Sequence, residues 1–140
     1  MIPKEIKDHK HAKTAWKSSS HRREKPWGHE LVWSGHDTIH GKILYISAGA
    51  RTSLKYHKLK AETLFFVSGI AKVTFGAENT FADPVAWPMQ EKEFSAGDTL
   101  SVQSGCPYRI HAVEDCEVIE IGNHLGDFAV RIEDDYGRVE

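Results

Sequence analysis

Short runs of residues that favour β-strands follow one another from Trp27 onward, and this spacing constrains the fold more than any other feature. Val, Ile, Thr, Phe and Tyr are frequent in these runs, and they pack well on a pleated sheet. Glycines fall between or beside the runs, where turns need them. No amphipathic helix of about ten or more residues is evident after the first 26 residues, and closely spaced strands without helices predict an all-β sandwich or barrel. The expected strands span residues 30–33, 42–47, 53–57, 63–67, 71–75, 99–102, 109–113, 117–121 and 129–132.

The longest break between expected strands covers residues 77–92. Pro84 and Pro88 argue against a central strand there, because proline cannot donate to the hydrogen-bond ladder. A break of this length is a functional loop or an expanded hairpin. Phe81 and Trp87 predict that it packs against a barrel rim or a partner subunit.

The bulk composition is that of one globular domain in the cytoplasm. The chain has 140 residues, of which 40% are hydrophobic and 27% are charged. It contains no run of about 18 apolar residues and no secretory signal, so we expect no membrane partner. Only two cysteines are present, Cys106 and Cys116, which excludes a disulfide framework and indicates a reducing compartment.

The charge is distributed unevenly along the chain. Residues 1–26 carry eight Lys and Arg against three Asp and Glu, whereas the remaining residues carry ten against seventeen. A basic arm can mark nucleic-acid binding, but no aromatic-rich basic groove follows it, so we expect no nucleic-acid partner. We expect residues 1–24 to form a basic, partly disordered arm and residues 25–140 to form the folded domain.

The residues with the clearest chemical potential lie between Gly49 and Gly69. Lys55 and His57 are two residues apart, so on one strand they point to the same face. Four residues separate His57 from Glu62, which is enough for a tight turn before the next apolar run.

This segment resembles the first motif of the cupin superfamily, in which a glycine is followed by a His-x-His or Gln-x-His pair and then by a glutamate. In that family the side chains converge inside a small β-barrel and hold a divalent metal. Residues 97–108 resemble the second cupin motif, with Gly97 and Gly105 at matching spacing. Gln103 stands where the family has a proline, and Tyr108 stands where it has its last metal ligand.

A narrower resemblance is to type II mannose-6-phosphate isomerases and to the isomerase domain of bifunctional mannose-1-phosphate guanylyltransferases. It covers about residues 25–138 and implies a double-stranded β-helix, that is, a jelly-roll-like barrel, with a sugar or sugar-phosphate ligand inside. It also implies a homodimer. The segments that carry it are residues 25–30, 54–57, 61–62, 67–69 and 132–138.

The metal site that this resemblance implies is degenerate. His57 and Glu62 stand at ligand positions, but Lys55 replaces a glutamine and Tyr108 replaces a histidine. A protonated lysine cannot bind a metal, and a tyrosine does so only as a phenolate. Two remaining ligands are fewer than the three of a catalytic zinc, and His111 lies on the opposite face of a regular strand from Tyr108. We therefore expect no cofactor; a divalent metal such as zinc on His57 and Glu62 is the alternative.

Catalysis without a metal is the chemistry that remains. Some cupins isomerise or epimerise nucleotide-linked sugars with a histidine base and a tyrosine acid, and the resemblance assigns these roles to His57 and Tyr108. Lys55 could stabilise an enediolate oxygen or a phosphate. Glu62 could orient His57, or it could pair with Lys55 in a purely structural salt bridge at the former metal position.

Two arginines are candidates for binding a phosphorylated substrate. Arg51 and Arg109 could each offer the bidentate fork of a guanidinium, although Arg109 shares the outward face of its strand with His111. The acidic tail, residues 133–135, is expected to be a solvated turn anchored by Tyr136.

The leading hypothesis is a sugar-phosphate or nucleotide-sugar isomerase or epimerase that acts by proton transfer. One alternative is a non-catalytic carbohydrate-binding cupin. Another is a metal-dependent isomerase with unusual ligands.

Overall fold

All regular structure in the described part of the chain is β-strand. The computed structural model describes residues 13–36, 38–123 and 128–138. Within these ranges there is no helix long and apolar enough to cross a membrane. The strands are β1 (His21–Lys25), β2 (Gly28–His36), β3 (Ile39–Ile46), β4 (Leu54–Tyr56), β5 (Glu62–Ser68), β6 (Ala71–Phe75), β7 (Gln90–Phe94), β8 (Thr99–Val102), β9 (Tyr108–Ala112), β10 (Cys116–Gly122) and β11 (Val130–Glu133).

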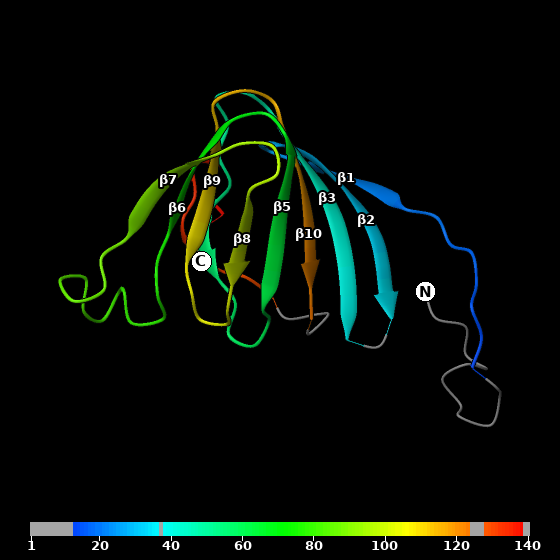
Figure 1. Ribbon diagram of the computed structural model, residues 1–140, viewed down its shortest axis with the longest axis horizontal. Helices are drawn as coiled ribbons and strands as arrows, with labels where there is room; N and C mark the ends of the chain where they lie inside the picture. The colour runs from blue at the N-terminus through cyan, green and yellow to red at the C-terminus, as the bar shows by residue number, and fades with distance from the viewer. Residues whose placement is uncertain (1–12, 37, 124–127, 139–140) are drawn as a thin grey trace.

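The strands form two antiparallel sheets that enclose a common interior (Figure 1). One sheet has six strands in the order β1-β2-β3-β10-β5-β8, and the other has five in the order β11-β4-β9-β6-β7. Non-consecutive neighbours such as β3 and β10 mean that the chain crosses from one sheet to the other and back. This arrangement is a double-stranded β-helix, so the predicted fold class is confirmed.

The inward faces of the strands divide the interior into an apolar half and a polar half. On β5, Leu64 and Phe66 are buried towards one end and Glu62 towards the other. The neighbouring β10 repeats this pattern with Val118 opposite Phe66 and Glu120 opposite Leu64. Full burial of one side chain such as Phe66 contributes about 1.5–3 kcal/mol. The apolar half comprises Trp27, Leu44, Ile46, Leu64, Phe66, Ala71, Val73, Phe94, Leu100, Val102, Tyr108, Ile110, Ala112, Cys116 and Val118.

All of the expected strands are present, and two further strands, β1 and β7, were not predicted. Both have mostly charged or polar, exposed side chains and lie at the edge of a sheet. Edge strands are commonly charged because this prevents pairing with other chains, and so they lack the apolar alternation that predicts a strand. Residues 21–24 of the expected arm therefore belong to the sheet, while residues 1–12 lie outside the described residues.

The break after β6 is an expanded hairpin, because β6 and β7 pair with each other in antiparallel register. Phe81 and Trp87 remain about half exposed, at 49% and 48%. They are therefore not part of the buried core. Packing against a barrel rim or a partner subunit stays a prediction.

Close packing around the turn between β5 and β6 can be tested by comparing two glycines. Gly69 lies in that turn, and Gly49 has a similar backbone conformation but open surroundings. Their φ angles are +87° and +85°, which L-residues adopt at a cost of about 1–2 kcal/mol. A Cβ on Gly69 would lie 2.2 Å from the Asp115 carbonyl oxygen, whereas a Cβ on Gly49 would meet nothing within 4 Å. We predict that Gly69→Ala lowers the free energy of unfolding, measured by urea denaturation, clearly more than Gly49→Ala does. Equal losses would contradict this packing of the turn.

Candidate active site

A cavity of about 450 Å³ opens between the two sheets on the side of β1, β2 and β3. Its lining includes seven Lys or Arg side chains and only two Glu side chains. Cavities of about 300–1,000 Å³ suit small molecules. The excess of positive charge favours an anionic ligand.

Glu62, the first residue of β5, lies behind the buried end of the cavity and contacts three of the surrounding side chains. The Tyr108 hydroxyl donates a hydrogen bond of 2.8 Å to Glu62 Oε1. His57 Nδ1 lies 3.4 Å from the same oxygen. The Lys60 ammonium lies 3.2 Å from Glu62 Oε2 and 3.2 Å from Glu120 Oε2, so it bridges the two carboxylates.

The two carboxylates have very different proton affinities. Burial, and then the negative charge of Glu120, raises the pKa of Glu62 to about 7 against the attraction of Lys60. Burial opposes ionisation of Glu120 as well, but Lys60, Lys42 and Lys55 outweigh it and lower its pKa to about 2. Glu120 therefore stays ionised at neutral pH, while Glu62 can hold or release a proton.

The pKa values of Lys55 and Lys60 are shifted in opposite directions. Burial lowers the pKa of Lys55, and the nearby carboxylates do not offset it. Glu120 and Glu62 outweigh burial at Lys60 and raise its pKa. Among the described residues no carboxylate lies within ion-pair distance of Lys55, whose ammonium sits 5.3 Å from the centroid of the Tyr108 ring. Lys60, and not Lys55, thus forms the salt bridge with Glu62.

The structure brings together all four residues that the sequence motifs placed at the centre of the site. Lys55 and His57 line the cavity, as their spacing predicted. Glu62 and Tyr108 lie behind them and do not line it. The Tyr108 ring is fully buried, and burial followed by the charge of Glu62 raises the pKa of its hydroxyl well above the usual value. Tyr108 therefore remains a protonated hydrogen-bond donor.

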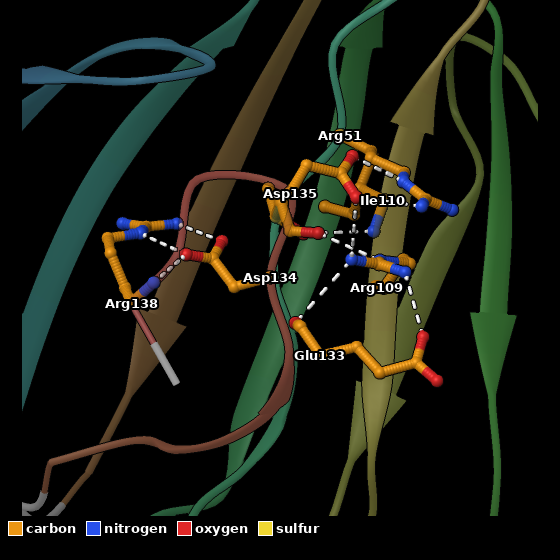
Figure 2. A network of polar contacts seen from close by, with 8 residues as sticks. Arg51, Arg109, Ile110, Glu133, Asp134, Asp135 and Arg138 are labelled. Carbon is orange, nitrogen blue, oxygen red and sulfur yellow. Dashed lines mark hydrogen bonds and ion pairs between the residues drawn. The ribbon is translucent and has the colours of Figure 1, made fainter. Parts of the chain in front are cut away.

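Arg51 and Arg109 lie outside the cavity lining, in contact with the C-terminal tail (Figure 2). Arg51 makes a bidentate salt bridge with Asp135, at 2.5 and 2.7 Å. Arg109 is buried, donates to the Thr52 carbonyl at 2.9 Å and contacts Glu133 at 3.3 Å. Both guanidinium groups are thus already engaged by protein acceptors.

The acidic tail is only partly the solvated turn that its sequence suggested: Glu133 and Asp135 are exposed, but Asp134 is not. Asp134 accepts hydrogen bonds from the Arg138 side chain at 2.9 and 3.0 Å, and its own side chain is fully buried. Tyr136 is 38% exposed and contacts the Arg138 guanidinium. The ion pairs, rather than Tyr136 alone, fasten the tail to the barrel.

The side chains at this site do not fit a divalent metal. Among the residues that the structure describes, no group of three or more His, Cys, Asp or Glu is placed to hold one. Lys55 and Tyr108, which the cupin resemblance places at two ligand positions, pair across β4 and β9, and the Lys60 ammonium is already in contact with Glu62. A divalent cation next to Glu62 would be repelled by both lysines.

Sequence reasoning missed Lys60 and Glu120. Glu120 carried a signal, since it is a charged residue at an inward position of the alternating strand β10. Lys60 lies in the turn before β5, where no periodicity indicates the direction of a side chain.

Comparisons with known proteins bear on the fold. No protein-family model matches the sequence. No curated protein matches it either. Among solved structures, a tryptophan-to-tyrosine variant of Bacillus subtilis oxalate decarboxylase matches at 22% identity and a TM-score of 0.63, over 74% of this chain and 27% of that chain. A deletion variant of the same enzyme matches at 20% identity and a TM-score of 0.69, over 81% and 30%. A third structure, from work on the Mn(II) centres of that enzyme, matches at 21% identity and a TM-score of 0.66, over 78% and 28%.

These matches span less than a third of the decarboxylase chain, and at this identity they show the fold alone. They support the fold that the cupin resemblance implies. The narrower resemblance to mannose-6-phosphate isomerases stays a prediction. The structure is a double-stranded β-helix, like the part of the decarboxylase that it matches.

The raised pKa of Glu62 predicts how stability depends on pH. A carboxyl that binds its proton more tightly in the folded state lowers stability above its unfolded pKa. The free energy of unfolding should therefore fall as pH rises from 4.5 towards 7, by about 3 kcal/mol from this group. We predict that Glu62→Gln removes this fall in urea denaturation at several pH values, whereas Glu91→Gln, at an exposed position on β7, keeps it. Parallel curves for wild type and Glu62→Gln would show that Glu62 does not titrate in this range.

Proposed function

We propose that this protein is an isomerase or epimerase that moves a proton on a sugar phosphate or nucleotide sugar bound inside the barrel. The observation that carries the proposal is the cluster of titratable groups at the buried end of a cationic cavity. His57 and Lys55 line the cavity, and Glu62, with a pKa of about 7, lies 3.4 Å from His57. Neighbouring groups whose pKa values are pushed apart are a common basis for acid–base catalysis.

In the proposed step, the His57 imidazole removes a proton from the carbon next to the substrate carbonyl. The electron pair of the broken C–H bond moves to the carbonyl oxygen and forms an enediolate. The Lys55 or Lys60 ammonium, both in the cavity lining, stabilises that oxygen. For an isomerisation, the His57 imidazolium returns the proton to the neighbouring carbon while the proton of the adjacent hydroxyl passes to the enediolate oxygen. For an epimerisation, a second acid on the opposite side of the sugar, such as the Lys60 ammonium of the cavity lining, protonates the same carbon.

Glu62 and Tyr108 support this step from behind the cavity. Glu62, when ionised, stabilises the imidazolium that forms on His57, because it lies beside Nδ1. The Tyr108 hydroxyl donates to the same carboxyl oxygen and keeps it in place. In this proposal Tyr108 is a positioning residue and not the acid that its sequence position suggested.

A ligand-binding protein without turnover is the second candidate. It is favoured by one observation: Glu62 and Tyr108 do not reach the cavity surface, so fewer acid–base groups face a ligand than in the sequence-based hypothesis. The two candidates differ in whether a bound sugar exchanges its carbon-bound proton.

We predict that mannose 6-phosphate or a nucleotide-linked keto sugar, incubated with the protein in D₂O, gains deuterium at the carbon next to the carbonyl, as measured by NMR. His57→Gln should lower the exchange rate by about 10²–10⁴-fold, the usual contribution of a general base. His111→Gln, outside the cavity lining, is the matched control and should leave the rate unchanged. Sugars that bind without exchange would support the ligand-binding candidate instead.

A further inference from the structure

Two positive side chains face each other on adjacent strands of the cavity wall. Arg131 on β11 lies directly opposite Lys55 on β4, and both line the cavity. Like charges directly opposite each other in a sheet are destabilising. Among the described residues neither side chain has a carboxylate within ion-pair distance, and the buried Arg131 Nε has no hydrogen-bond partner.

Two further lysines add to this charge on the other sheet. Lys25 and Lys42 lie 3.7 and 3.4 Å from the two oxygens of Glu30, a carboxylate whose side chain is 3% exposed. The single carboxylate of Glu30 thus pairs with two ammonium groups. Burial lowers the pKa of Lys25; Glu30 counteracts this, while Lys42, Arg138 and Arg131 lower it further. Lys42 and Arg131 therefore lie close enough to Lys25 to repel it, and the charge of Lys42 also acts on Lys55, whose pKa burial lowers first.

We propose that Arg131, Lys55, Lys42 and Lys25 form a binding site for a phosphoryl group, nearer the exposed side of the cavity than the Glu62 cluster. A guanidinium can bind two phosphoryl oxygens at once, and ammonium groups add charge without fixed geometry. A bound dianion would relieve the repulsion between Arg131 and Lys55. The inference rests on the proposed function for the identity of the rest of the ligand, but the phosphoryl site can be tested without turnover.

The tail explains how Arg131 is kept in this position. Arg131 belongs to β11, and the residues that follow it are held by Arg51 through Asp135 and by Arg109 through Glu133 (Figure 2). Arg51 and Arg109, which the sequence suggested as phosphate ligands, thus fix strand β11. That strand carries Arg131, the arginine that lines the cavity.

The test is isothermal titration calorimetry of the 140-residue chain with inorganic phosphate and with pyrophosphate, at constant ionic strength. We expect Arg131→Gln to weaken binding at least tenfold and Arg131→Lys to restore part of it. Lys72→Gln, an exposed lysine on β6 outside the cavity lining, should bind as wild type does. Pyrophosphate binding at least tenfold tighter than phosphate would point to a diphosphate-linked ligand, and similar affinities would point to a phosphate monoester; both support the site.

Thermal unfolding separates a lost site from a misfolded variant. Without phosphate, Arg131→Gln should melt at the same temperature as wild type or higher, because it removes a repulsion. When phosphate is added, the melting temperature of the wild type should rise by more than that of Arg131→Gln. Equal phosphate affinity in wild type and Arg131→Gln, or no binding beyond that of chloride, would overturn the proposal. The two proposals can fail separately. If Arg131→Gln loses phosphate binding but the wild type exchanges no deuterium into the sugars, the phosphoryl site is supported and the isomerase proposal is refuted.

Discussion

The ammonium of Lys60 lies between two buried carboxylates, and the polar half of the barrel depends on this contact. Glu62 and Glu120 enter the interior from adjacent strands, β5 and β10, where two unpaired negative charges would repel each other. Lys60 lies 3.2 Å from both, and loss of one member of such a buried pair typically costs about 3–5 kcal/mol. The same contact leaves Lys55 without a carboxylate partner and facing the cavity. Because Lys60 pairs with the two carboxylates, the Lys55 side chain stays available to a ligand.

The cavity is also shaped by a segment far from the cupin-like motifs. The C-terminal tail contributes Arg131 and Arg138 to the wall, and Arg51 and Arg109 bind the acidic residues between them. These salt bridges are partly exposed, and isolated exposed pairs are each worth only about 0–1 kcal/mol. Their importance therefore lies in geometry, since several contacts together fix one strand. The positive charge of the cavity is assembled from both sheets and from this tail.

The sequence predicted those features that depend on local periodicity and motif spacing. Runs rich in β-branched and aromatic residues predicted the strands, and spacing placed Lys55 and His57 on one face. The resemblance to the two cupin motifs implied that these two residues converge with Glu62 and Tyr108. The polar edge strands β1 and β7 could not be predicted, because exposed edges carry no apolar pattern. The bridging role of Lys60 and the burial of Arg109 under the tail arise from contacts between segments distant in sequence, such as Lys60 with Glu120. A regular strand placed Arg109 opposite to Tyr108, but strand geometry alone does not say what covers that face.

The central claim is that lysine ammonium groups occupy the place of a metal ion inside this β-barrel. Inductively coupled plasma mass spectrometry of untagged protein, before and after exposure to zinc, manganese, iron and nickel, tests it most directly. The account predicts well below one ion per chain in every case, because Lys55 and Lys60 repel a divalent cation at Glu62. One tightly bound ion per chain, removable by chelation, would contradict it and would favour a metal-dependent isomerase.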